Sequence, residues 1–365
     1  MTAYDFAVIG AGIAGASIAA ELAEHATVLL LEGEDQPGYH ATGRSAAFWE
    51  QCYGGPEIVP LTLASGDYLR AEGVLRRRGA LYIARAEQAG LLDDFMARFG
   101  PTGAGIERLG RDALAEIVPR IEPAWTGAVW EPECADIDVA ALHQHYLARG
   151  RKSEVTLATR ARVAGLVREG GVWRMTCTDG RAFAAATLVN AAGAWADGVA
   201  ALAGLPPLGI RPLRRTVVQL RTDPAPPPDL PLVLDIAGRF YFKPEGARLW
   251  LSPHDEVPSE PCDAAPEELA VAEAIDRLAG VVPWRVEAVE RRWAGLRSFA
   301  PDRLPVYGRD PRLPAFAWFA GQGGYGIQTA PAAARLAAQG LLGTGPDVMT
   351  ARLDPARYAP GRLLP

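Results

Sequence analysis

A glycine-rich turn near the N-terminus limits the fold of this 365-residue chain more than any other feature. Residues 4–9 (YDFAVI) are typical of a buried β-strand, and GAGIAG follows at 10–15. Residues 13–22 are rich in alanine, isoleucine and leucine, which favours a helix. Residues 27–31 form a second apolar run that ends in Glu32. Strand, glycine turn, helix, strand and acid together make one βαβ unit.

The glycine spacing of this unit is suited to a dinucleotide. Gly10 allows the tight turn, Gly12 lets the backbone approach a pyrophosphate, and Gly15 lets helix and strand pack closely. The N-terminus of the helix attracts the phosphates. Glu32 is placed to accept hydrogen bonds from the ribose, and an acid at this position disfavours a 2′-phosphate. The predicted contacts from this unit are Gly10, Gly12, Ile13, Ala14, Gly15, Glu32 and Gly33.

Three later segments of small residues favour FAD over NAD as the dinucleotide. They are 42–47 (TGRSAA), 190–195 (NAAGAW) and 321–326 (GQGGYG). A flavin needs contacts along its whole length, and these segments lie far apart in the sequence. A helix that starts near Ile327 would also point its positive dipole end at the flavin. The further predicted FAD contacts are Thr42, Gly43, Arg44, Ser45, Ala46, Val163, Ala192, Gly193, Trp195, Gly323, Gly324, Tyr325, Gly326, Ile327 and Gln328.

Charge and cysteine usage exclude several other classes of protein. The net charge of −6 argues against a nucleic-acid partner. Four cysteines without a CxxC pair exclude a zinc ribbon or a dithiol redox motif, and no metal site is expected. The same spacing argues against a disulfide framework, so a cytoplasmic location is expected. No apolar run reaches the roughly 18 residues that span a bilayer, which leaves only peripheral membrane contact open.

The remaining periodicities predict an α/β fold with two domains. Alternating runs at 216–221, 239–243 and 248–252 are typical of an antiparallel sheet. We therefore expect a Rossmann-like FAD-binding domain and a second α+β substrate domain built on a mostly antiparallel sheet. The expected FAD-binding domain is discontinuous and comprises 1–52, 133–206 and 290–365. The expected substrate-binding domain comprises 53–132 and 207–289.

Several runs resemble a known superfamily. They are 41–47 (ATGRSAA), 135–138 (ADID), 190–195 (NAAGAW), 293–298 (WAGLRS) and 322–329 (QGGYGIQT). They resemble the FAD-dependent D-amino acid oxidase, glycine oxidase and sarcosine oxidase superfamily, and are most similar to bacterial D-arginine dehydrogenases. The resemblance implies a non-covalent FAD and a small amino-acid substrate. It favours a dehydrogenase over an oxidase, with a quinone or oxygen as the electron acceptor left open.

The resemblance also implies a clamp for the substrate carboxylate, made by Tyr53, Arg215, Tyr241 and Arg297. Arginine presents a planar fork that matches a carboxylate, and tyrosine hydroxyls donate to the same oxygens. Arg214 and Arg215 are neighbours on a strand, so one faces inward and the other outward. The choice of Arg215 rests on the resemblance. The predicted substrate contacts are these four residues with Phe48, Gly324 and Tyr325.

Three departures from the D-arginine enzymes concern the substrate side chain. Phe48 stands where those enzymes carry a histidine, and Ala80 and Gly238 lie near their two acids. Burying a cationic side chain without a counter-charge is costly, so a neutral or apolar side chain is expected. Two alternatives stay open: Glu50 supplies the missing charge, or Arg239 admits an acidic side chain.

The expected reaction is FAD-dependent oxidative deamination of a D-amino acid. Hydride would pass from Cα to flavin N5, and the imino acid would hydrolyse to a 2-oxo acid. The same scaffold also suits a secondary-amine oxidase for sarcosine, glycine or D-proline. A 2-hydroxy-acid dehydrogenase would need a buried histidine base, and none of the five histidines lies in a motif. A non-catalytic FAD-binding subunit would not need the arginine clamp.

Overall fold

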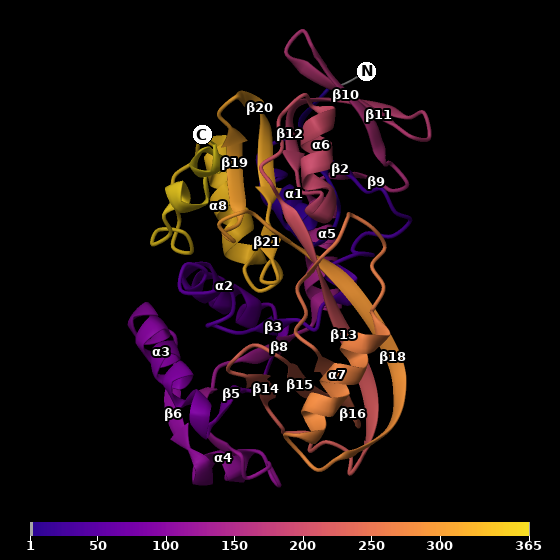
Figure 1. The fold of residues 1–365 in the computed structure, drawn as a ribbon. Helices are drawn as coiled ribbons and strands as arrows, with labels where there is room; N and C mark the ends of the chain where they lie inside the picture. Colours follow the sequence, from indigo (N-terminus) through magenta and orange to yellow (C-terminus); the bar gives the residue numbers. More distant parts are fainter. Residues whose placement is uncertain (1–2, 365) are drawn as a thin grey trace.

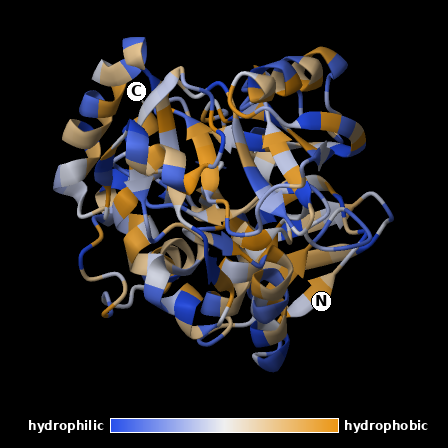
Figure 2. Ribbon diagram, turned by 90° about the horizontal axis from the view of Figure 1, so that it is seen from below, coloured by the Kyte–Doolittle hydropathy of each residue, from blue (hydrophilic) through white to orange (hydrophobic). Residues whose placement is uncertain are grey.

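Two large β-sheets lie at opposite ends of the molecule, with a small sheet between them (Figure 1). The computed structural model describes residues 3–364. The first sheet has eight strands and the second has ten. Strands in the interior are largely hydrophobic, whereas the peripheral helices alternate hydrophilic and hydrophobic residues (Figure 2).

The eight-stranded sheet has a parallel centre that contains the predicted βαβ unit. Its parallel strands follow the order β9 (Thr156–Ala158), β2 (Val28–Leu31), β1 (Tyr4–Ile9), β12 (Ala182–Asn190) and β20 (Leu313–Ala320). Helix α1 (Ile13–Leu22) connects β1 to β2, which confirms that prediction. Antiparallel additions are β19 (Val306–Asp310) beside β20, and β10 (Val163–Glu169) and β11 (Val172–Cys177) beside the first half of β12.

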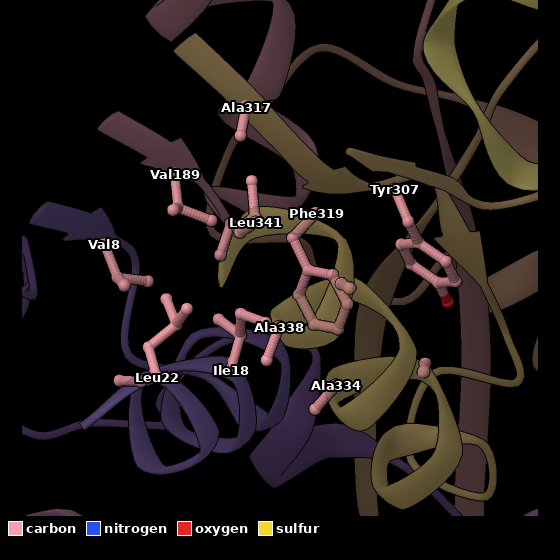
Figure 3. Close-up of a cluster of buried hydrophobic side chains, with 14 of the residues drawn as sticks. Val8, Ile18, Leu22, Val189, Tyr307, Ala317, Phe319, Ala334, Ala338 and Leu341 are labelled. Atoms are coloured by element: carbon pink, nitrogen blue, oxygen red, sulfur yellow. The ribbon is translucent and has the colours of Figure 1, made fainter. Parts of the chain in front are cut away.

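Both faces of the parallel strands are buried, which explains their continuous apolar sequence. Val8 and Leu30 face one cluster, in which α1 packs against α8 (Ala330–Leu342) (Figure 3). Their neighbours Ile9 and Leu31 face the opposite cluster, which contains α6 (Ala196–Leu202). Helix α5 (Val139–Lys152) packs beside α1. The side chain of Asp138 caps it by accepting from Ala141 N at 2.9 Å.

The ten-stranded sheet is almost entirely antiparallel, which confirms the predicted type of sheet. Its order is β21 (Gln322–Gly323), β18 (Arg285–Phe299), β13 (Arg211–Asp223), β16 (Arg248–Ser252), β15 (Tyr241–Glu245), β14 (Leu232–Asp235), β5 (Ala80–Arg85), β7 (Trp125–Glu131) and β6 (Glu107–Gly110), with β17 (Val257–Pro258) beside β13. Strands β14 and β5 are the parallel pair.

The two faces of this sheet have different roles. Helices α4 (Arg111–Ile117) and α7 (Glu268–Ala279) cover the outer face. Helix α3 (Ala89–Phe99) packs against the inner face. Alternation along β13 sends Val218 to the outer cluster and Val217 to the inner one. The inner face is the one turned toward the candidate site.

A three-stranded sheet and helix α2 (Val59–Ala71) lie between the two large sheets (Figure 1). The small sheet contains β3 (Phe48–Trp49), β8 (Ala135–Ile137) and β4 (Leu75–Arg77). Strand β18 was not predicted, because Arg291 and Arg292 are exposed and give its sequence no apolar alternation. It pairs with β13 along its length and continues to Phe299, beyond the boundary expected at 290. The expected domain boundary at 290 thus falls inside this strand, and the division into two domains stays a prediction.

Among residues 3–364, no helix is both long and apolar enough to cross a bilayer.

Candidate active site

A cavity of about 560 Å³ lies between the two large sheets. One end is formed where the parallel strands stop, at Gly10 after β1 and Glu32 after β2. The other end is the inner face of the ten-stranded sheet, around Val217 and Leu234. Ligands of α/β sheets bind outside the carboxyl ends of the strands, so the topology puts a ligand site here.

The first end is a narrow cradle that only glycine permits. Gly10 has φ +100°, and a Cβ there would lie 2.6 Å from the carbonyl oxygen of Ala191. A Cβ on Gly15 would lie 1.7 Å from the carbonyl oxygen of Gly10, so Gly15 allows α1 to pack on the turn. Thr42 Oγ1 accepts a hydrogen bond from Ile13 N at 2.9 Å and ties the second small-residue segment to the start of α1.

Glu32 joins this cradle as predicted from its position after β2. Its Oε2 accepts from Ala11 N at 2.9 Å, and its Oε1 accepts from Glu34 N at 3.0 Å. The carboxylate therefore holds the glycine turn and also lines the cavity. A fixed acceptor at this place suits ribose hydroxyls. Together with the glycine cradle and the elongated lining, it fits an FAD whose adenosine lies at this end.

Most residues predicted to contact FAD line the cavity. These are Gly10, Gly12, Ile13, Ala14, Glu32, Gly33, Thr42, Arg44, Ser45, Ala46, Val163, Ala192, Gly193, Trp195, Gly323, Gly324, Gly326, Ile327 and Gln328.

Three of the predicted contacts lie outside this lining. Gly15 and Gly43 are packing positions, since a Cβ on Gly43 would lie 2.8 Å from the carbonyl oxygen of Gly38. The side chain of Tyr325 also lies outside the lining, so its contacts with FAD and with the substrate stay predictions. Its ring packs against Phe299 in an apolar cluster, and its hydroxyl donates to the Arg303 carbonyl.

At the other end, all four residues of the predicted carboxylate clamp line the cavity. Arg215 lies opposite Gly295 in the β13–β18 pairing, two positions from Arg297, so both arginines point from the same face. Arg297 Nη1 donates to the Tyr53 hydroxyl at 2.7 Å. Tyr241 comes from β15 and packs edge-on against Phe48, with ring centroids 6.1 Å apart.

The two clamp arginines share Glu256 as a counter-ion and still have buried donors without a hydrogen-bond partner. Burial and the nearby charge of Arg297 lower the pKa of Arg215 to about 10. Arg215 Nη2 and Arg297 Nε are buried without a hydrogen-bond partner. Arg215 Nε donates to the Asp255 carbonyl at 2.8 Å, and Glu256 Oε1 lies 3.1 Å from Arg297 Nη2. Buried unsatisfied donors are costly, and a carboxylate in the cavity would satisfy them.

Arg214 faces away from the clamp. It lies outside the cavity lining, and its Nη1 donates to Glu267 at 2.7 Å. The expected alternation along the strand therefore puts Arg215 inward and Arg214 outward.

The wall beside the clamp is apolar. Phe48, Val217, Leu232 and Leu234 line it. Two positions used in the specificity argument lie elsewhere. Ala80 is fully buried outside the lining, and Gly238 sits in the turn after β14, where its carbonyl accepts from His254. Arg239 donates to Asp235 at 2.7 Å and also lies outside the lining. The apolar character of the pocket is therefore due to these four wall residues and not to Ala80 or Gly238.

Sequence reasoning missed His254, which lines the cavity beside the clamp. Its Nδ1 donates to the Gly238 carbonyl at 2.8 Å, so its Nε2 is the unprotonated nitrogen. Burial and the charges of Arg215 and Arg297 lower the pKa of His254 to about 3, which keeps the ring neutral. No motif marks this histidine. Only the fold of the loop after β16 brings it to the clamp.

The comparisons with known proteins agree with this geometry. The model of the FAD dependent oxidoreductase (DAO) family matches residues 5–340. Glycine oxidase of Geobacillus kaustophilus is 27% identical over 348 residues, which covers 90% of each chain. Its crystal structure superposes with a TM-score of 0.85 at 25% identity and 98% coverage of both chains. L-Proline dehydrogenase from P. horikoshii gives a TM-score of 0.85 at 22% identity, covering 99% of this chain and 97% of that chain.

Proposed function

Because this chain belongs to the DAO family of FAD-dependent oxidoreductases, we propose that it oxidises a D-amino acid with a neutral or apolar side chain. The product is an imino acid, which water hydrolyses to a 2-oxo acid and ammonia. The D configuration rests on the sequence runs similar to D-arginine dehydrogenases. We place the enzyme in the cytoplasm, with a quinone or oxygen as the final electron acceptor.

The observation that carries this proposal is the pair of buried arginines with unused N–H groups. Arg215 and Arg297 project from neighbouring strands into one cavity, and each keeps a donor without a partner. Two fixed forks of this kind hold a carboxylate in one orientation. A retained clamp of this sort also argues against a purely structural FAD-binding subunit.

The residues of the chain contribute mainly by positioning. FAD, when bound, supplies the acceptor for the hydride that leaves Cα. Arg215 and Arg297 bind the substrate carboxylate, and the Tyr53 hydroxyl, itself hydrogen-bonded to Arg297, faces the same space. Phe48 and Leu234 exclude water from the part of the cavity that would hold the substrate side chain. Orientation of this kind contributes a large share of the rate enhancement in such reactions.

The neutral-side-chain preference is supported by the apolar wall. Each CH₂ buried there contributes about 0.8 kcal/mol, while an unpaired buried cation costs more than that. We therefore expect D-leucine and D-methionine to have a higher kcat/KM than D-arginine near neutral pH.

A secondary amine such as sarcosine or D-proline, or glycine itself, is the second candidate substrate. It is favoured by the similarity to glycine oxidase, which extends over 90% of both chains.

A 2-hydroxy acid is the third candidate substrate. It is favoured by His254, because a neutral histidine beside the clamp is the base that hydroxyl oxidation would need.

Anaerobic flavin bleaching tests these candidates together. The purified yellow protein is mixed with D-leucine, D-methionine, D-arginine, L-leucine, sarcosine, D-proline and D-lactate in separate experiments. We expect the fastest bleaching with the neutral D-amino acids. If D-arginine leads every neutral substrate by tenfold, the interpretation of the pocket is wrong. If only D-lactate bleaches the flavin, the amine assignment is wrong.

A further inference from the structure

A buried pair of glutamates has one member, Glu50, in the wall of the cavity and the other, Glu131, outside the lining. Glu50 follows β3 and lines the cavity, and Glu131 is the last residue of β7 and is 0% exposed. An oxygen of each carboxyl lies within 4.8 Å of the other. The Tyr82 hydroxyl donates to Glu50, while Gln51 N donates to Glu131 at 2.7 Å and Cys52 N donates at 3.4 Å.

Within residues 3–364, no cation compensates this pair. No arginine, lysine or histidine in this part of the chain lies within 4.0 Å of an oxygen of either carboxyl, and the largest cause of both raised pKa values is burial. The neighbouring titratable groups are Tyr82, Cys52 and Cys134, and burial raises the pKa of each. Arg78 and Lys243 are both paired with Asp136, at 2.6 and 2.9 Å, and neither forms an ion pair with Glu50 or Glu131.

An uncompensated buried charge is costly, so the pair retains protons. Burial and the charge of Glu131 raise the pKa of Glu50 well above its ordinary value. Burial also raises the pKa of Glu131. Glu131 is the better site for a negative charge, because two backbone N–H groups already donate to it.

We propose that the Glu50–Glu131 pair selects substrates by the charge of their side chain. With both carboxyls protonated, the pocket accepts an apolar side chain. When one proton has left to solvent, the pair accepts a primary ammonium or guanidinium group, which then serves as its missing counter-charge. This inference rests on the proposed amino-acid oxidation and identifies the two residues that would select the substrate by its side chain.

The direction of the pH effect follows from the raised pKa values. An ordinary glutamate ionises near pH 4.3. This pair ionises at a higher pH, so preference for a cationic side chain should grow as pH rises through that range. The side chain of lysine stays charged up to about pH 10. The change in preference therefore belongs to the enzyme and not to the substrate.

The test uses D-lysine and D-norleucine, which have the same chain length and differ in the terminal ammonium. The ratio of their kcat/KM values is measured on the holoenzyme from about pH 5.5 to about pH 9. We expect the D-lysine preference to rise at least about tenfold in the wild-type enzyme. In the double variant Glu50→Gln/Glu131→Gln, which has neither carboxyl left to ionise, the ratio should be independent of pH. Glu133→Gln, a nearby exposed carboxylate paired with Arg77, should follow the wild type.

The pH profile of the wild-type enzyme decides the proposal even where a variant fails to fold. A pH-independent ratio in an enzyme that oxidises D-norleucine would overturn the selector and leave the proposed function standing. Proton release in weakly buffered solution gives a second readout. D-lysine binding should release a proton that D-norleucine binding does not, and equal release from both would also overturn the selector. Failure of every amino acid to reduce the flavin would overturn the proposed function itself.

Discussion

The two ends of the cavity are built in different ways. The end that fits FAD, here called the cofactor end, is formed by backbone atoms of short segments such as Gly10 to Gly15. Glycines there leave space that a side chain would fill. The substrate end uses side chains from strands that are distant in sequence, such as Arg215 and Arg297. Substitutions at the first end therefore act through steric exclusion. Substitutions at the second end act through charge and hydrogen bonding.

The largest expected effect is at the cofactor end, in Gly15→Ala. The added Cβ would lie 1.7 Å from the Gly10 carbonyl oxygen. Overpacking usually costs about 1–3 kcal/mol, and a backbone oxygen this close cannot be relieved by a change of rotamer. We expect the FAD content of the purified protein to fall by at least about tenfold. Flavin absorbance per protein and the thermal melting temperature measure the effect.

Gly340→Ala is the matched control for that substitution. A Cβ at this exposed position of α8 meets nothing within 4 Å. Replacing a helical glycine by alanine there should stabilise the protein by about 0.5–1 kcal/mol. Equal loss of FAD from both variants would show that the cofactor end does not depend on the close approach of α1 to the turn.

The next largest effect is expected at the substrate end, in Arg297→Ala and Arg215→Ala. Removing one charged partner of a buried carboxylate costs about 2–4 kcal/mol. This corresponds to a loss of about 30- to 700-fold in kcat/KM. The FAD content should stay near the wild-type level, because neither arginine belongs to the glycine cradle. Steady-state kinetics with flavin spectra separates the two ends of the cavity.

Arg214→Ala provides the control on the same strand. Its guanidinium lies outside the lining and pairs with Glu267 and with the Asp255 side chain, so kcat/KM should fall much less than in Arg215→Ala. If Arg214→Ala and Arg215→Ala were equally damaging, the assignment of the two strand faces would be wrong. If Arg297→Ala lost its flavin, the distinction between the two ends would also break down.

The smallest change is expected in Cys262→Ser, which should leave FAD binding and FAD release unchanged. Cys262 is an exposed, free cysteine that lines the cavity, whereas the cysteines at 52, 134 and 177 are buried. We expect FAD to be held without a covalent bond, so acid precipitation should release it from the wild-type and variant proteins alike. Flavin that stays with the wild-type pellet but not with the variant pellet would show a bond to this sulfur.

The cofactor end was largely predictable from sequence, because its signals are local. Gly10, Gly12 and Glu32 lie within one βαβ unit, and their spacing alone defines the cradle. The side chain of Tyr325 shows what such local signals leave open. The glycines around it indicate a turn, but only tertiary packing decides that its ring enters the cluster with Phe299.

At the substrate end, only the residues covered by the strand alternation or by the family resemblance could be predicted from sequence. Alternation gave two possibilities for Arg214 and Arg215, and resemblance chose between them. Glu131 lies 81 positions after Glu50, and only the fold of the sheet brings the two carboxyls together. His254 likewise reaches the clamp through a loop without a motif. Contacts made by such long-range pairing leave no local signal in the chain.

The division of the substrate end between different strands has a consequence for evolution. The clamp arginines lie on β13 and β18, whereas much of the side-chain wall comes from β3 and β14. Under the proposed function, mutations at positions 48, 50, 232 and 234 would alter which substrate is accepted while both clamp arginines stay in place. After gene duplication, substitutions at these few positions could change the substrate range of one copy while its FAD-binding residues stay unchanged.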